Sequence, residues 1–264
     1  MDDTLRTCYE ALGFRQTPFS ITPDTGLFFP GGRHVAAYKQ VYHACMSGVI
    51  SVLSGEIGLG KTLVVRCVLR TLPETVRVAY LINPLMDLPD LLRAIGRDFG
   101  GPALPDDAPL SVLQSHLVDT VLKGAREGVR FVVIVDEAHR LSGDALESLR
   151  LLSNLETERS KLIGLVLVGQ PELERTLALR AMRPLRERVG VWLKLDPFSR
   201  TECHAYVRHR IQRTHRDGQF EFSRMALWWL QWYTRGVPRR INLACERAVL
   251  LALRHERQLA FELP

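Results

Sequence analysis

The sequence has few cysteines, no long apolar run and no N-terminal signal core. Its 264 residues include five cysteines, an odd number without a Cys-x-x-Cys pair, which argues against a disulfide framework or a zinc site. The most apolar stretches, 131–135 and 162–168, fall far short of the roughly 18 residues that a membrane span needs. The N-terminus is acidic and lacks the apolar core of a signal peptide. We therefore expect a soluble, cytoplasmic protein with reduced thiols.

Residues 1–197 have no surplus of positive charge, and the whole surplus lies in the last quarter of the chain. The formal net charge is +6, and residues 198–264 alone carry 12 Arg, no Lys and 6 Asp or Glu. Such a segment suits nucleic acid, anionic lipid or the phosphates of a nucleotide, and it also suits a solvated helical surface. Charge alone leaves these alternatives open.

Short apolar runs alternate with segments of helical periodicity between residues 48 and 195. This alternation predicts an α/β fold with a parallel sheet of five strands covered by helices on both faces. After Pro197 the pattern is purely helical. The expected strands are 48–53, 76–82, 131–135, 162–168 and 190–195, and the expected helices are 33–46, 61–72, 87–99, 110–127, 142–158, 199–213, 223–233 and 238–255.

A glycine-rich loop follows the first expected strand. Its eight residues match the Walker A pattern G-x-x-x-x-G-K-[ST]: Gly55, Glu56, Ile57, Gly58, Leu59, Gly60, Lys61 and Thr62. Backbone N–H groups of such a loop surround phosphate oxygens at the positive end of the next helix. We expect Lys61 to reach the β- and γ-phosphates of ATP and the Thr62 hydroxyl to bind Mg²⁺.

A pair of carboxylates follows the apolar strand 131–135. Asp136 and Glu137 are expected at the carboxyl end of a central parallel strand, where such sheets bind ligands. In this Walker B position Asp136 would hold hydrated Mg²⁺ and Glu137 would activate the attacking water. His139 could sense the nucleotide, or it could begin a helix or serve in packing.

Another polar residue, Gln170, follows the strand 162–168. At the tip of a strand beside Asp136 it would hydrogen-bond the γ-phosphate or the attacking water, with an N-cap role as the alternative.

Several arginines lie near the end of the α/β region. An arginine there could reach the nucleotide of a neighbouring subunit and stabilise the charge on the phosphoryl group during its transfer. Arg188 is the first choice, and Arg186 and Arg183 are the other candidates; solvated surface arginines are the alternative. Arg239, in the first turn of the last helix after Pro238, would report the γ-phosphate to the helical region, or would lie on a capped surface helix.

Taken in order, these motifs resemble the AAA+ ATPases, and more narrowly the ExeA/GspA family of general secretion pathway ATPases and MshM-type pilus ATPases. The stretches that carry this resemblance are 18–24, 55–62, 149–157, 169–173 and 236–242. The resemblance implies a P-loop NTPase with an N-terminal extension (1–47), an AAA+ core (48–197) and a helical lid (198–264). It also implies nucleotide roles for Lys61, Thr62, Asp136, Glu137, Gln170 and Arg239, with Leu63 completing the nucleotide-binding segment.

Secretion members of the family continue into a transmembrane helix and a peptidoglycan-binding domain, and this sequence ends at Pro264 with neither. The expectation is therefore an oligomeric, Mg²⁺-dependent ATPase, a ring or filament, that assembles a type IV pilus or type II secretion apparatus. Its partners would be assembly proteins at the inner membrane, and its location cytoplasmic or peripheral to that membrane.

Two other hypotheses stay open. One is a DNA-bound AAA+ regulator of transposition, which the basic last quarter supports. The other is a scaffold that binds nucleotide without hydrolysis, against which the intact Glu137 argues. We expect the aromatic residues of the helical region to form lid core rather than to stack on bases: Trp228, Trp229, Trp232 and Tyr233.

Overall fold

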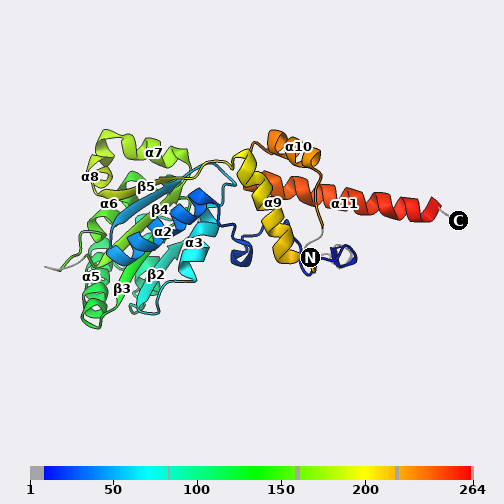
Figure 1. Ribbon diagram of the computed structural model, residues 1–264. Coiled ribbons are helices and arrows are strands. Elements are labelled where there is room, and N and C mark those ends of the chain that lie inside the picture. Colours follow the sequence, from blue (N-terminus) through cyan, green and yellow to red (C-terminus); the bar gives the residue numbers. More distant parts are fainter. Residues whose placement is uncertain (1–8, 83, 158–160, 218–219, 263–264) are drawn as a thin grey trace. The chain divides into compact units, whose positions relative to one another are not determined.

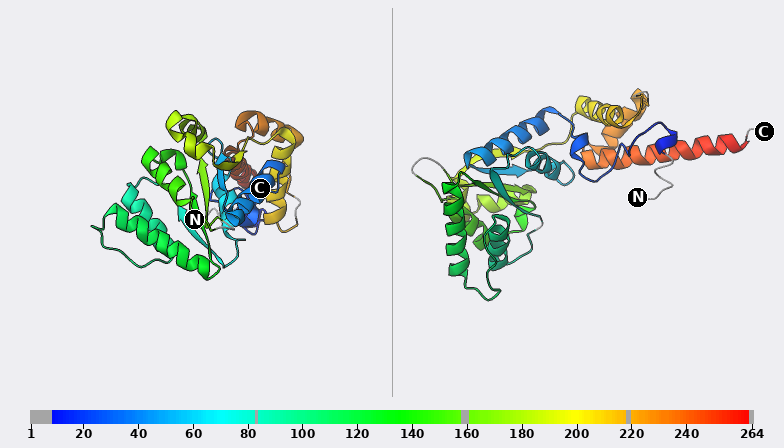
Figure 2. Two further views of the ribbon diagram at one scale, coloured as in Figure 1. Left: turned by 90° about the vertical axis from the view of Figure 1, so that its left-hand side faces the viewer. Right: turned by 90° about the horizontal axis from the view of Figure 1, so that it is seen from below.

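The computed structural model describes residues 9–82, 84–157, 161–217 and 220–262. They divide into two compact units, drawn in Figures 1 and 2. The sheet unit comprises Val35–Ile57 and Val64–Leu195. The helical unit comprises the described residues up to His34, Gly58–Leu63 and the chain from Asp196 onward. Both ends of the chain thus contribute to the helical unit.

The sheet unit is built on five parallel strands in the order β2-β3-β4-β1-β5. These strands are β1 (Ile50–Ser54), β2 (Val76–Leu81), β3 (Arg130–Val135), β4 (Ile163–Gly169) and β5 (Val189–Lys194). The continuous apolar sequences of β3 and β4 fit strands that are covered on both faces, and β1 and β4 are buried along their whole length. The five-stranded parallel sheet predicted from sequence is confirmed.

The register aligns the carboxyl ends of three strands at one edge of this sheet. Ser54 at the end of β1 pairs with Gly169 at the end of β4, and Val135 at the end of β3 pairs with Leu167. The loop after β1, the residue pair after β3 and the residue after β4 therefore all leave the sheet at the same edge, where parallel sheets bind ligands.

Helices cover both faces of the sheet (Figures 1 and 2). On one face α2 approaches β4 so closely that a Cβ at Gly164 would lie 3.3 Å from the carbonyl oxygen of Ala44. On the other face α4 and α5 bury Leu91, Leu117 and their neighbours against β3. The helices of this part of the chain are α2 (Gly32–Ser47), α3 (Lys61–Leu69), α4 (Leu88–Asp98), α5 (Leu110–Arg126), α6 (Gly143–Leu152), α7 (Pro171–Ala178) and α8 (Arg183–Arg186), with 3-10 turns η2 (Ala138–Arg140) and η3 (Arg180–Met182).

The helical unit packs α9 (Arg200–Thr214), α10 (Arg224–Thr234) and α11 (Pro238–Glu262) together with the N-terminal segment and its 3-10 turn η1 (Thr25–Leu27). Its core is aromatic, with Phe14, Phe19 and Phe198 almost completely buried. The buried Arg210 of α9 donates hydrogen bonds to the carbonyl oxygens of Pro18 (2.8 Å) and Ser20 (3.2 Å). The N-terminal segment is therefore an integral layer of this unit.

Two predictions about local structure are corrected. The helix expected over 142–158 ends at Leu152, because the chain turns back at Ser153 and pairs Glu156 with Lys161 before it enters β4; Glu158 lies outside the described residues. The aromatic residues of α10, expected in the core, are exposed: Trp228, Trp229, Trp232 and Tyr233. Leu227, Leu230 and Thr234 occupy the inward positions of that helix instead.

Within the described residues, no helix is both long enough and apolar enough to cross a bilayer.

Candidate functional site

The Gly55–Thr62 loop connects β1 to α3, and Lys61 is the first residue of that helix. Gly58 (φ 83°) and Gly60 (φ 95°) have left-handed backbone conformations, which residues with a Cβ rarely adopt. The sequence Gly-Leu-Gly thus permits the loop to turn sharply before the helix. Lys61 is only 6% exposed, and Thr62 and Leu63 follow it in the first turn.

The last helix begins directly beside this loop. The backbone N–H of Arg239 donates to the carbonyl oxygen of Gly58 at 3.2 Å, and a Cβ at Gly58 would lie 2.8 Å from the Cβ of Arg239. Only glycine permits this approach. The structure therefore places Arg239, one of the predicted nucleotide residues, against the loop through its backbone, while its side chain is exposed.

A histidine that sequence analysis missed supports the same loop. His34 of α2 is 5% exposed, and its Nε2 lies 2.7 Å from the carbonyl oxygen of Leu59. Burial lowers the pKa of His34, so the neutral ring donates this hydrogen bond through Nε2–H. Nothing in the sequence around His34 signals this role, because the contact joins residues 25 positions apart.

Asp136 is fixed at the carboxyl end of β3. It is 2% exposed, its N–H donates to the Leu81 carbonyl (2.8 Å), and its Oδ1 accepts from the N–H of Glu137 (3.0 Å). Tyr80 of β2 donates its hydroxyl to Oδ2 at 3.2 Å. Burial, together with the charge of Asp136, raises the pKa of Tyr80, which keeps the phenol protonated as a donor. Tyr80 was also missed, although a tyrosine near the end of a neighbouring strand is a usable signal.

Glu137 forms a cluster with His139 and Gln170. The amide Nε2 of Gln170 donates to Oε2 of Glu137 at 3.1 Å, and Nε2 of His139 lies 3.5 Å from the same oxygen. The backbone N–H of Gln170 points at Nδ1 of His139 (3.4 Å), which favours the tautomer that carries its proton on Nε2, facing Glu137. The sequence predicted Glu137 and Gln170 at the ends of neighbouring strands, and the structure brings them together with His139.

The backbone of Glu137 is itself unusual. Its φ of 57° and ψ of 35° are left-handed, and among described non-glycine residues only Arg235 shares this feature. Such conformations in residues with a side chain are concentrated at functional sites. Here the conformation turns the chain from β3 into η2, while the carboxylate of Glu137 stays within reach of Gln170.

Comparison with known proteins identifies the domain family of the chain. Residues 46–177 match the AAA domain family. The chain belongs to this family. The AAA protein described here is 40% identical to General secretion pathway protein A of Aeromonas hydrophila over 241 residues, which are 91% of this chain and 44% of that relative. The chain thus spans less than half of the relative's length, and the similarity confirms the resemblance to the ExeA/GspA ATPases.

Solved structures share the same fold. Cdc6p from Pyrobaculum aerophilum superimposes with a TM-score of 0.68 at 16% identity, over 88% of this chain and 67% of that one. The ORC2 protein of Aeropyrum pernix gives a TM-score of 0.62 at 21% identity, over 90% of this chain and 67% of that one. These similarities show that the AAA protein has the P-loop AAA fold.

The candidate arginines lie elsewhere in the sheet unit. Arg188 directly precedes β5, at the amino edge of the sheet, and is exposed beside a cavity of about 470 Å³ that Ile50 and Lys161 also line. Arg183 is paired with Glu187 (2.7 Å), and Arg186 donates to the carbonyl of Ala178 (3.1 Å). Within the sheet unit the structure therefore does not bring Arg188 together with Glu137 and Gln170.

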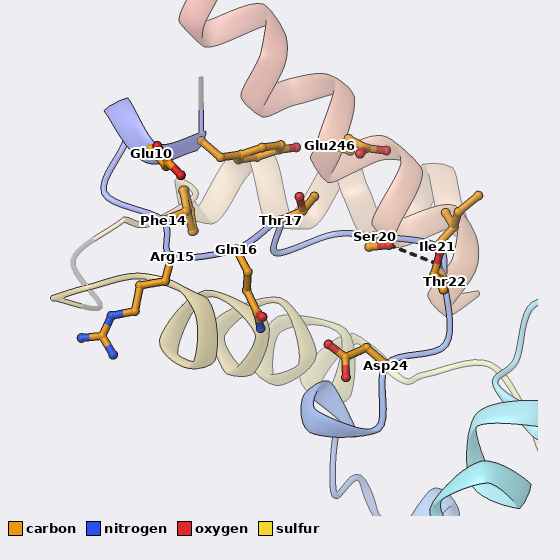
Figure 3. Close-up of a pocket in the computed structure, with 11 residues that line it drawn as sticks. Glu10, Phe14, Arg15, Gln16, Thr17, Ser20, Ile21, Thr22, Asp24 and Glu246 are labelled. Atoms are coloured by element: carbon orange, nitrogen blue, oxygen red, sulfur yellow. Dashed lines mark hydrogen bonds between the residues drawn. The ribbon is translucent and has the colours of Figure 1, made fainter. Parts of the chain in front are cut away.

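A second hollow lies in the helical unit of the AAA protein. Figure 3 shows this cavity of about 550 Å³, which the N-terminal segment lines together with Glu246 of α11. Three carboxylates (Glu10, Asp24 and Glu246) border it against one guanidinium (Arg15), and Ser20 accepts a hydrogen bond from the N–H of Thr22. This acidic lining does not suit phosphate groups, and none of the predicted nucleotide residues takes part in it.

Proposed function

We propose that this AAA protein binds Mg²⁺-ATP and hydrolyses it. The observation that carries the proposal is the pair of carboxylates after β3, where Tyr80 holds Asp136 and Gln170 holds Glu137. The pair lies at the edge of the sheet from which the Gly55–Thr62 loop departs, as ATP hydrolysis in a P-loop fold requires. The membership in the AAA family supports it.

In this proposal the backbone of Gly55–Thr62 binds the phosphates, with Leu63 extending the binding segment. Lys61 neutralises charge on the β- and γ-phosphates. Arg239 would respond to the nucleotide bound by this loop, and the hydrogen bond from its backbone N–H to the carbonyl of Gly58 supports this role.

Thr62 and Asp136 are the residues that would hold Mg²⁺. A hydroxyl and a carboxylate are the oxygen donors that this ion takes in P-loop proteins, with waters completing its coordination. The ion neutralises charge on the β- and γ-phosphates when it is bound. Two hydrogen bonds already orient the Asp136 carboxylate, from Tyr80 and from the N–H of Glu137, which suits a metal ligand.

Glu137 is the proposed general base. Its carboxylate accepts a proton from the water whose oxygen attacks the γ-phosphorus, while the bond between that phosphorus and the oxygen bridging to the β-phosphate breaks and ADP leaves. Gln170 orients this carboxylate through its amide and would bind the γ-phosphate or the attacking water. Arg188 would act on the nucleotide of a neighbouring subunit, in a ring or filament of this chain.

For the biological role we propose the assembly of a type II secretion or type IV pilus apparatus, with assembly proteins at the inner membrane as partners and a location in the cytoplasm or at that membrane. The 40% identical relative is a general secretion pathway protein, which favours this role over DNA-bound regulation of transposition. The ATPase rate should therefore not rise when duplex DNA is added; strong stimulation that fades with salt would contradict the assignment.

Substitution of the two key site residues tests the mechanism. Glu137→Gln should retain ATP binding by calorimetry and lose at least about a hundredfold in hydrolysis, because the amide cannot accept the proton. Lys61→Ala should weaken ATP binding itself. Glu127→Gln, at the C-terminal end of α5, is the matched control and should leave both measurements unchanged. Hydrolysis at the wild-type rate in Glu137→Gln would refute the role of Glu137.

A further inference from the structure

Helix α10 exposes a large apolar face on the helical unit. Met225 is 70% exposed, Trp232 67% and Tyr233 66%, and Trp228 and Trp229 are 42% and 52% exposed. Monomeric proteins rarely leave such a contiguous apolar surface in water, and patches of this kind mark interaction sites.

The helix that exposes these residues is itself firmly packed on the rest of the helical unit. Leu227 and Leu230 pack on the aromatic core of the helical unit. Thr234 is completely buried and donates its hydroxyl to the carbonyl of Leu230 at 2.7 Å, and Gln231 donates to the carbonyl of Phe198 at 3.2 Å. Figure 1 shows α10 packed on α9 and α11. The inward face of α10 is thus occupied, and the aromatic face is held outward.

The segment of the chain that contains α10 carries charge of one sign. No Asp or Glu occurs between Glu221 and Glu246. The same segment contains four exposed arginines: Arg224 and Arg235 at the two ends of α10, followed by Arg239 and Arg240. An anionic partner would therefore be attracted, and a cationic one repelled.

We propose that α10 is a membrane-contacting helix that inserts its aromatic face into the headgroup region of an anionic bilayer. Tryptophan and tyrosine favour this region because each combines a large apolar ring with a polar N–H or O–H. An anionic surface attracts the arginines beside the inserted rings. Two signals, apolar insertion and basic charge, are what stable reversible binding to a membrane requires.

Two other occupants fit less well. A second copy of this chain, placed face to face on the same patch, would bring Arg224 and Arg235 against like charges, in a segment (222–245) whose sequence contains no Asp or Glu to offset them. Bases of nucleic acid need open ring faces for stacking. The indoles of α10 instead pack on one another edge to face, Trp228 on Trp229 at 83° and Trp229 on Trp232 at 90°.

Flotation of the full chain with vesicles tests the proposal. The protein should float with vesicles of phosphatidylcholine that contain phosphatidylglycerol, and at least about tenfold less with phosphatidylcholine alone, with binding that weakens as salt is added. Trp229→Ser with Trp232→Ser should lose at least tenfold in binding. Trp192→Ser is the matched control, because it removes an exposed tryptophan of β5 (44%) and should bind normally. Circular dichroism would verify that each variant is folded.

A fluorescence measurement gives an independent readout. The chain has four tryptophans, so Trp192→Phe leaves only those of α10. Its emission should shift to shorter wavelength with the anionic vesicles and stay unchanged with single-stranded or duplex DNA. Removing charge by Arg224→Gln with Arg235→Asn, where Asn tolerates the left-handed backbone of Arg235, should weaken vesicle binding.

Several outcomes would overturn the proposal. One is failure to float with anionic vesicles, and another is flotation that the double tryptophan variant retains. A shift in emission with DNA but not with vesicles would assign the face to nucleic acid. Concentration-dependent self-association without vesicles, abolished by the double variant, would assign it to a second copy of the chain.

Discussion

Glu137 shows how a single residue can carry local strain for a chemical purpose. Its left-handed backbone costs about 1 to 2 kcal/mol in a residue with a side chain, yet the conformation is fixed by the turn from β3 into η2. The same side chain accepts a hydrogen bond from Gln170. A residue chosen for stability alone would be glycine or asparagine, and the glutamate is explained by its proposed role as base.

His34 allows a prediction at the same scale. Its pKa is lowered by burial, so the unfolded chain binds more protons than the folded one near and below its usual pKa of about 6.5. The free energy of unfolding should therefore fall as the pH drops through this range, by at most about 1.4 kcal/mol per pH unit for one such group. His209, whose pKa is also lowered by burial, contributes in the same direction.

Urea unfolding at about pH 7.5 and about pH 5.5 would measure this dependence. His34→Gln replaces Nε2–H with an amide donor that does not titrate, and it should make the pH dependence shallower. An unchanged dependence in that variant would show that His34 is not the titrating group.

At the scale of strands and helices, the parallel sheet separates two sets of predicted catalytic residues. Glu137 and Gln170 leave its carboxyl edge, whereas Arg188 precedes β5 at the amino edge. The six residues of β5 span about 20 Å at about 3.3 Å each, more than an arginine side chain can bridge. In the proposed mechanism Arg188 would therefore serve only the nucleotide of another chain.

Mixing two inactive variants tests this conclusion. Arg188→Ala should lose at least about a thousandfold in ATP hydrolysis, as removal of an arginine finger does, while ATP still binds. In a mixture of the two variants, Arg188→Ala protomers keep Glu137 intact, and Glu137→Gln protomers supply them with an intact Arg188. The rate of ATP hydrolysis by the mixture should therefore be at least about tenfold higher than that of either variant alone. Absence of any recovery in mixed oligomers would argue against action between subunits.

At the scale of the whole molecule, the helical unit is assembled from both chain ends. Phe14 and His215 form an antiparallel bridge, and the N–H of Arg15 donates to the carbonyl of Thr214 at 2.8 Å. Asn242 of α11 bonds Tyr206 (2.8 Å) and the carbonyl of Ser20 (3.3 Å). These bonds satisfy buried polar groups that neither end could satisfy alone.

Arg210 is the test of this assembly. Arg210→Ala would leave the buried carbonyl of Pro18 without its donor and would remove one of two donors to the carbonyl of Ser20, which Asn242 also bonds. The free energy of unfolding should fall by about 2 to 4 kcal/mol. The N-terminal segment should also become more sensitive to limited proteolysis. Arg208→Ala, an exposed position on the same helix, is the control and should change stability by less than about 0.5 kcal/mol.

The strands and most helices could be predicted from the sequence, because the spacing of apolar residues over a short segment shows which face of an element is buried. It also located Asp136, Glu137 and Gln170, since polar residues directly after apolar strands meet at one edge of a parallel sheet. It erred at α10, because the spacing of Trp228, Trp229 and Trp232 does not show whether the core or a partner covers them.

By itself the sequence determined the glycine-rich loop, the carboxylate pair and the parallel class of the sheet, since each depends on neighbouring residues alone. The tertiary structure decided the strand order, the supporting roles of His34 and Tyr80 and the pairing of the N-terminal segment with α9 and α11. These features join residues far apart in the chain. Which surfaces meet depends on complementary shape and on the satisfaction of buried polar groups, and no local pattern records either.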